Sequence, residues 1–364
     1  MPVLPLLLVL SLSFVPVSTA MAAGAEPFAE LRSAQRMGWD TASILAQGMA
    51  GSDPRRFPGI HAWLKEYRAI GGVPGKRAAT AVIPKFDVDR LVTRSPAFWR
   101  AYFEMAPADS GAMLLHAGLL LAAGEASRAA YVLLIARQNR DIGKEMLEGI
   151  NAMLEHAQGV LQRGAQEVSE AVKLHDAGSP QAAATRLRTL LAEWPGNALA
   201  HYELALTMVA QQYADSGRKP PLRARLSIHS ELSPSTAALS AYTRARSHDP
   251  LLIRAYQGNE GSGANVLMVL GKTVRPLWES IARDTQAETS DDTLNTLAGA
   301  LHEAGIAELA VATIQVLVAR EGGYDDDDRK FIAAVLRGLA PSAIDVVIKR
   351  LAQARPEFAK IVLP

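Results

Sequence analysis

Apolar residues recur at spacings of three and four along most of this chain, which is the period of an α-helix. One such stripe covers residues 143–174 and predicts either one long helix or a hairpin broken near Gly159 or Gly164. Alternation of β-branched and polar residues is nowhere long enough for a sheet, and the two weak strand candidates are residues 82–83 and 361–363. The pattern therefore predicts an all-α fold.

The N-terminal part of the pattern is broken by glycine and proline. Helical stretches at residues 28–49 and 60–70 are separated by Gly- and Pro-rich breaks at 51–54, 57–59 and 71–75. Glycine permits left-handed turns and proline removes a helix donor, so these breaks end helices. We interpret residues 23–94 as an N-terminal helical cap region.

A repeated pattern begins near residue 95. An alanine is followed four positions later by a large apolar or aromatic residue, and three positions after that by another apolar residue. The four copies are Ala129/Leu133/Ala136, Ala183/Leu187/Leu190, Ala238/Tyr242/Ala245 and Ala310/Ile314/Leu317. A glycine lies five positions before three of them, at Gly124, Gly178 and Gly305, and a proline follows two, at Pro195 and Pro250.

These residues resemble the tetratricopeptide repeat, a helix–turn–helix unit of about 34 residues with small residues where its helices cross. The resemblance covers about residues 95–322 and implies a right-handed superhelix of stacked hairpins. The repeats are enlarged and irregular, since the aligned alanines lie 54, 55 and 72 positions apart. An inserted loop is expected at about 211–233. Residues 323–364, with a helix beginning at Pro341, are expected to form the C-terminal cap.

In that family the first helix of each hairpin lines a concave groove that receives a partner peptide or helix. In this register the inward positions are largely apolar, which favours an amphipathic helix or an apolar peptide. The residues of this chain that align with the groove positions of the family are Leu114, Val168, Val172, His175, Tyr202, Leu206, Asn295 and His302. The alternative is that neighbouring helices of the enlarged repeats cover these side chains.

The first 22 residues have the features of a secretory signal. An apolar stretch at 4–17 is followed by Ala20-Met21-Ala22, so cleavage after Ala22 would leave 342 of the 364 residues. No Lys or Arg precedes the apolar stretch, and an uncleaved membrane anchor is the alternative. No later stretch is apolar enough for a stable membrane span. The chain has no cysteine, which suits an oxidising compartment such as the periplasm or the exterior.

The overall charge is balanced. Lys plus Arg number 38 and Asp plus Glu 37, for a formal net charge of +1, which argues against a nucleic-acid partner. One local cluster stands out within the expected inserted loop: Arg218, Lys219, Arg223 and Arg225. It is either a solvated loop or an arm that docks on an acidic protein or an anionic envelope polymer.

Catalytic motifs are absent from the sequence. There is neither H-E-x-x-H nor G-x-S-x-G, and the eight histidines form no ligand pair at helical spacing. A Gly-rich stretch at 258–264 is interpreted as a loop, with an anion site as its alternative. Four aspartates at 325–328 are interpreted as the start of a helix, with Ca²⁺ binding as their alternative. We expect no catalytic, cofactor or metal site, and no cofactor.

Two functional hypotheses follow. The first is an exported, non-enzymatic helical-repeat protein of the cell envelope that holds or assembles a protein partner. The second is an envelope protein that binds or degrades polysaccharide, by analogy with other α-superhelices. Glycan sites need aromatic platforms and paired carboxylates, so the two differ in where the five tryptophans lie. Tryptophans that cluster with acidic residues in a cleft would favour the second hypothesis. Tryptophans buried separately in the hairpin cores would favour the first, and we expect such burial for Trp99 and Trp194.

Overall fold

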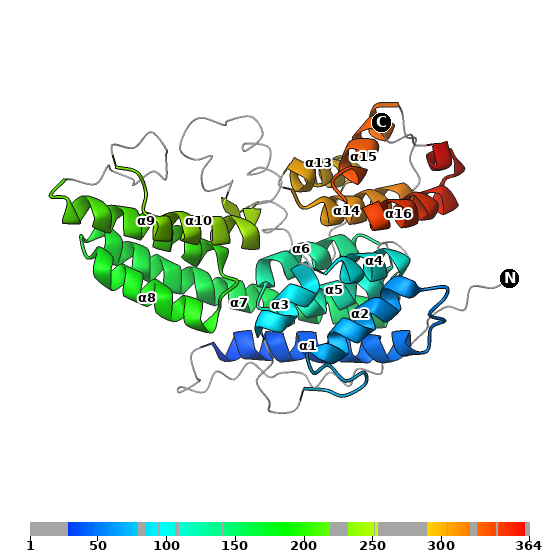
Figure 1. The fold of residues 1–364 in the computed structure, drawn as a ribbon, viewed down its shortest axis with the longest axis horizontal. Helices are drawn as coiled ribbons and strands as arrows, with labels where there is room; N and C mark the ends of the chain where they lie inside the picture. Colours follow the sequence, from blue (N-terminus) through cyan, green and yellow to red (C-terminus); the bar gives the residue numbers. More distant parts are fainter. Residues whose placement is uncertain are drawn as a thin grey trace.

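The computed structural model shows an all-helical protein over the residues it describes (Figure 1). Those residues are 28–78, 85–93, 95–105, 109–139, 142–218, 232–250, 252–253, 290–303, 305–320, 326–339 and 341–360. Within them no strand is formed. The signal-like segment, both weak strand candidates and the Gly-rich stretch at 258–264 lie outside these residues.

The helices fall into three groups that are consecutive in the chain. The first contains α1 (Ala29–Ala50), α2 (Pro58–Ala69), α3 (Lys85–Thr93), α4 (Pro96–Glu104), α5 (Ser110–Ala122) and α6 (Ala126–Arg137). The second contains α7 (Lys144–Asp176), α8 (Pro180–Glu193), α9 (Ala198–Asp215) and α10 (Thr236–His248). The third contains α13 (Asp291–Glu303), α14 (Ala307–Ala319), α15 (Asp326–Leu336) and α16 (Pro341–Ala354), followed by a 3-10 turn at Pro356–Lys360.

Helix α7 connects the first two groups. It is one unbroken helix of 33 residues, about 50 Å long, so of the two interpretations of this stripe the single helix is confirmed. It packs against α1, α5 and α6 and also against α8 and α9. Gly164 does not interrupt it; the missing side chain makes room for the ring of Trp194 and the amide of Asn197.

The three predicted turn glycines end their helices in the same way. Gly124, Gly178 and Gly305 have φ values of 81°, 79° and 79°, in the left-handed region that favours glycine. After each, the next backbone N–H donates to a carbonyl five residues back; Glu125 N reaches Leu120 O at 2.8 Å. This is the Schellman arrangement, and it folds α5–α6, α7–α8 and α13–α14 into antiparallel hairpins.

Helix α1 covers the face of α5 that the repeat register places inward. The two helices cross so closely that a Cβ atom on Gly38 would overlap the carbonyl oxygen of Gly118. Leu114, one turn from Gly118, is 4% exposed within the main core, which also contains α1 and α2 side chains such as Trp63. At the α5–α6 hairpin the expected groove residue Leu114 is therefore covered by a neighbouring helix, which is the alternative that the sequence left open.

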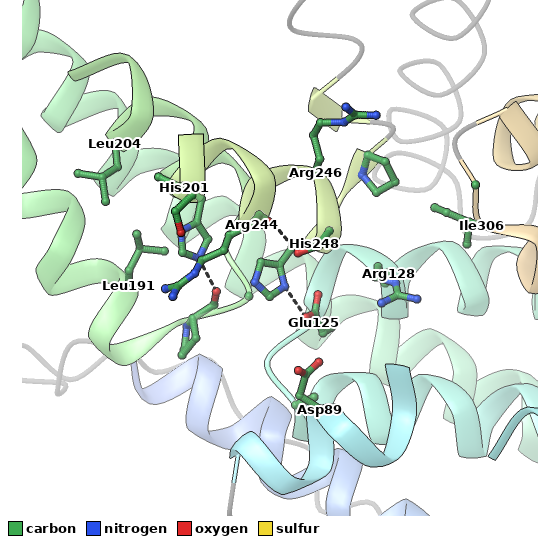
Figure 2. Close-up of a pocket in the computed structure, with 18 of the residues that line it drawn as sticks. Asp89, Glu125, Arg128, Leu191, His201, Leu204, Arg244, Arg246, His248 and Ile306 are labelled. Atoms are coloured by element: carbon green, nitrogen blue, oxygen red, sulfur yellow. Dashed lines mark hydrogen bonds and ion pairs between the residues drawn. The ribbon is translucent and has the colours of Figure 1, made fainter. Parts of the chain in front are cut away.

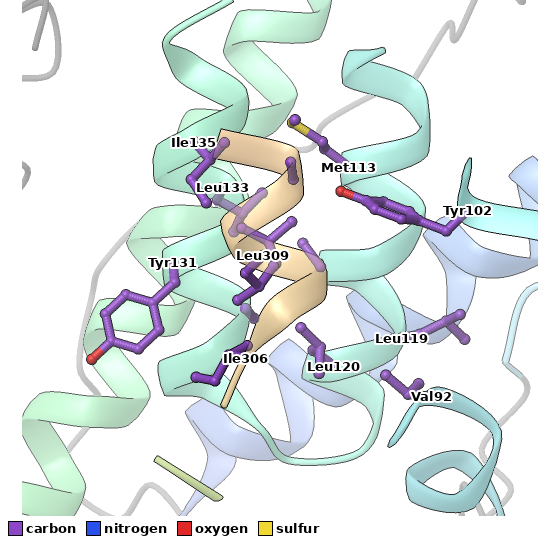
Figure 3. Close-up of a cluster of buried hydrophobic side chains, with 14 of the residues drawn as sticks. Val92, Tyr102, Met113, Leu119, Leu120, Tyr131, Leu133, Ile135, Ile306 and Leu309 are labelled. Carbon is purple, nitrogen blue, oxygen red and sulfur yellow. The ribbon is translucent and has the colours of Figure 1, made fainter. Parts of the chain in front are cut away.

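The third group packs back onto the first (Figure 1). Figure 3 shows Ile306 and Leu309 of the α14 segment among Leu133 and Ile135 of α6 and Met113 of α5. Polar contacts add to this apolar packing: the buried Arg320 guanidinium donates to Gln138 O at 2.9 Å and pairs with Asp291 at 2.8 Å. The α13–α14 hairpin therefore lies on α5–α6.

The expected loop after α9 begins later than the sequence suggested. Residues 211–215 belong to α9, which ends at Asp215, because Tyr213 continues its apolar face and is 4% exposed against Val209 and Ala238. The Gln212 side chain bonds Ser233 O and Ser235 N and so fixes the start of α10.

Two features of the C-terminal region agree with the sequence. Helix α16 begins at Pro341, and α15 begins within the aspartate run, at Asp326. Among the described helices, none combines the length and the apolar character that a bilayer-spanning helix requires.

Candidate binding cleft

An open cleft lies where the hairpin turns of the three groups meet (Figure 2). Its volume is about 1000 Å³, and residues of α3, α6, α8, α9, α10 and the α13–α14 turn line it. That volume is at the upper end of the usual range for small-molecule pockets. The α5–α6 turn, the α8–α9 connection at Pro195 and Gly196, and the α13–α14 turn meet there.

A direct contact holds two of the turns together. The indole N–H of Trp194, at the end of α8, donates to Gly124 O of the α5–α6 turn at 2.6 Å. Gly196 fits against the same carbonyl group, and a Cβ atom there would overlap it. Because Trp194 is 2% exposed, this contact fixes the second helical group on the first at the edge of the cleft.

Arginines from two helices of the second group line one part of the cleft. Arg188 comes from α8, and Arg244 and Arg246 come from α10. All three side chains are exposed, and none forms an ion pair within the part of the chain that the structure describes. Solvated guanidinium groups of this kind can bind carboxylates in a bidentate manner.

Apolar side chains line the cleft together with these arginines. Leu191 of α8 and Leu204 and Met208 of α9 line the same part of the cleft, and Figure 2 shows Leu191 and Leu204 on the side of His201 and Arg244. Ile306 lies at the opposite end, near Arg128. The cleft is therefore amphipathic.

Two histidines stack at its centre. The rings of His201 and His248 lie 5.3 Å apart with an interplanar angle of 11°. His248 Nδ1 bonds Glu125 Oε1 at 2.5 Å, which joins the end of α10 to the α5–α6 turn. His201 Nε2 donates to Pro195 O at 2.9 Å, and burial lowers the His201 pKa to about 4, so this ring is neutral at pH 7.

Buried carboxyl groups support the other side of the cleft. Asp249 accepts hydrogen bonds from Ser127 and Tyr131 and from Leu252 N, and burial raises its pKa despite these bonds. Burial likewise raises the pKa of Glu308, which lines the cleft. The Arg128 guanidinium opposes both shifts by favouring the charged carboxylates.

The groove residues expected from the repeat resemblance lie elsewhere. Their burial differs: Leu114, Val168 and Tyr202 are buried, Val172, His175, Leu206 and His302 are half-buried, and Asn295 is exposed. Tyr202 and Leu206 pack against α10, His175 contacts Thr207 of α9, and His302 packs against Phe331 of α15. The structure does not gather these eight residues into one surface, and none of them lines the cleft.

The basic cluster is only partly described. Arg218 is exposed just after α9, and its N–H donates to Tyr213 O at 3.0 Å. Lys219, Arg223 and Arg225 lie outside the described residues.

Of the described tryptophans only Trp99 lines the cleft, and Trp39 and Trp63 both pack against Tyr67. Trp39, Trp63, Trp99 and Trp194 are each at most 8% exposed, and Trp278 lies outside the described residues. Trp99 touches the cleft, but its ring packs edge-on against Tyr102 and His116. The predicted burial of Trp99 and Trp194 is confirmed.

His116 lies in the core. The side chain is fully buried between Phe98, Trp99 and Tyr102, but neither ring nitrogen has a hydrogen-bond partner among the described residues. Burial lowers its pKa well below the usual range. Within the described part of the chain, no group of three or more His, Asp or Glu residues is placed to hold a metal ion.

Sequence reasoning missed the residues that form the cleft. Glu125 and His248 are 123 positions apart, and Arg188 and Arg244 stand on different hairpins, so no local spacing connects them. Only the repeated sequence pattern could have indicated them, because it places Glu125 directly after a turn glycine and His248 two residues before the terminal Pro250. Each therefore lies near the end of a hairpin, where the turns meet.

No protein-family model, curated protein or solved structure significantly similar to this chain was found.

Proposed function

We propose that this protein is an exported, non-enzymatic helical-repeat protein that holds a partner protein of the cell envelope in its amphipathic cleft. The export step rests on the signal-like first 22 residues. The mode of action is binding by a preformed surface rather than chemistry at a reactive group.

The observation that carries this proposal is the composition of the cleft. Exposed Arg188 and Arg244 stand beside the apolar Leu191, Leu204 and Met208 in an open volume of about 1000 Å³. Arginine next to apolar side chains is typical of surfaces that bind proteins. The cleft replaces the row of inward side chains as the binding surface, because several of those side chains are buried.

The repeat interpretation supports the same proposal. Three hairpins share one turn geometry at Gly124, Gly178 and Gly305. We infer that α5–α6, α7–α8 and α9–α10 form a short tetratricopeptide-like, right-handed run, onto whose first hairpin α13–α14 packs. Such runs present surfaces for partner segments.

Polysaccharide binding or degradation is less well supported. The cleft contains carboxyl groups at Asp89, Glu125 and Glu308, but Glu125 is bonded to His248. Four tryptophans are buried, and only Trp99 among them lines the cleft. A glycan site would need an exposed aromatic platform.

Affinity capture from a cell-envelope extract tests the proposal. The baits are the wild-type chain, an Arg188→Glu/Arg244→Glu variant, and a Lys65→Glu/Arg68→Glu control with the same charge change on the exposed face of α2. We expect a protein that binds the wild type and the control and is lost from the cleft variant. Equal capture by all three baits, or no captured protein, would contradict a binding role for the cleft.

A further inference from the structure

We propose that the cleft binds an extended, acidic segment of the partner, with carboxylates placed at Arg188 and Arg244 and apolar side chains on Leu191 and Met208, the two half-buried apolar residues of this part of the cleft. This inference rests on the proposed function and specifies the chemistry of the partner. It follows from the charge pattern and the apolar residues of the cleft.

The accessible charge in this part of the cleft is positive. Arg188 and Arg244 each stand about one turn before the end of their helices, α8 and α10, and both helices pack against α9. Both arginines line the cleft together with Leu204 and Met208 of α9, and neither forms an ion pair with a described carboxylate. A carboxylate that binds either guanidinium group gains charge-assisted hydrogen bonds that the free protein does not make.

The carboxyl groups that line the cleft are those of Asp89, Glu125 and Glu308, and none of them forms an ion pair with Arg188 or Arg244. Glu125 is 2% exposed and engaged by His248, and Asp249 is 1% exposed and bonded to Ser127 and Tyr131. Figure 2 shows Glu125 on the side of the α5–α6 turn, next to His248. Arg188, Arg244 and Arg246 make the α8 and α10 side of the cleft basic, whereas Arg128 lies with the carboxyl groups of Glu125 and Glu308 on the α6 side. An acidic ligand is therefore favoured on the α8 and α10 side.

The apolar residues of the cleft indicate a ligand that carries apolar side chains as well as carboxylates. Leu204 and Met208 are one turn apart on α9, and Leu191 of α8 lies beside them. An extended peptide places alternate side chains on opposite sides, about 3.3 Å apart along the chain, so acidic and apolar side chains can face different walls.

Binding of peptides to the purified product of the full-length chain tests this proposal. The probe is a fluorescent octapeptide of alternating Glu and Leu with both ends blocked, measured by fluorescence anisotropy at low and high salt. The comparison probes are the same peptide with Lys in place of Glu, and an oligogalacturonate of similar charge as the polysaccharide arm. We expect the Glu peptide to bind with an affinity that falls as salt rises, and the other two to bind at least about tenfold more weakly.

Matched variants locate the site. Arg188→Glu/Arg244→Glu should weaken binding of the Glu peptide by at least about tenfold, and Lys65→Glu/Arg68→Glu should leave it unchanged. Unchanged circular dichroism and thermal unfolding show that each variant is folded. The proposal is overturned if the Glu peptide does not bind, if the Lys peptide or the oligogalacturonate binds as tightly, or if both variants behave alike. Failure here together with cleft-dependent capture of a protein would reject the acidic segment and retain the proposed function.

Discussion

Buried polar residues join segments that are distant in the sequence. Glu104, at the end of α4, accepts from the backbone N–H groups of Gly59 and Ile60 and so caps the first turn of α2. Arg350 of α16 donates to the Glu104 carbonyl oxygen at 2.7 Å. One residue therefore connects three helices, and local sequence patterns do not reveal it because the partners are more than 40 positions away.

Histidine burial makes stability depend on pH. The folded-state pKa of His201 is about 4, below the value of about 6.5 expected in the unfolded chain. Between these values the unfolded state binds more protons, so the stabilising contribution is present above about pH 6.5 and is lost as pH falls towards 4. The fully buried His116 acts in the same direction.

A His201→Gln variant isolates this contribution. Between pH 7 and pH 4 we expect the free energy of unfolding of the wild type to fall by about 3 kcal/mol more than that of the variant. Urea unfolding at four or five pH values measures the difference. The opposing contributions of Asp249 and Glu308, whose pKa values are raised, are common to both proteins. Parallel pH profiles would show that His201 titrates normally in the folded state.

Small residues determine how closely the helices pack. Gly38 and Gly118 allow α1 and α5 to meet backbone to backbone, whereas Gly149, also buried in a helix, has no other atom near the position of a Cβ. Gly38 and Gly149 therefore have opposite roles. Gly38 is required where α1 crosses α5, whereas Gly149 only lowers the helix propensity of α7.

Alanine substitutions at these two glycines test that difference. Gly38→Ala should destabilise the protein by about 2–3 kcal/mol, because the methyl group would overlap the α5 backbone. Gly149→Ala should leave stability unchanged or raise it by up to about 1 kcal/mol. Urea unfolding measures both. A Gly38→Ala protein as stable as the wild type would mean that α1 does not cross α5 at this point.

Much of the helix order could be predicted from the sequence. Turn glycines such as Gly124 and the start of α16 at Pro341 are local signals that depend on backbone geometry. The end of α9 was placed too early because Tyr213 is held by contacts with α10, which no local pattern shows. The covering of Leu114 by α1 was predicted only as an alternative, since the sequence does not say which helices pack together.

At the scale of the whole molecule, the cleft results from how the hairpins assemble. Packing of α14 on α6 brings Ile306 and Glu308 to one side, and the Trp194–Gly124 contact brings α8–α10 to the other. None of these segments forms the cleft alone. The cleft therefore could not be predicted from any single hairpin.

Site-specific photocrosslinking tests the central claim most directly. A benzophenone-bearing residue is introduced in place of Ser240, which is exposed in the cleft, or in place of Lys65 on the exposed face of α2, and each protein is irradiated in the cell-envelope extract. We expect a crosslinked protein partner from position 240 and none from position 65. A partner that crosslinks equally from both positions, or only from position 65, would contradict a binding role for the cleft.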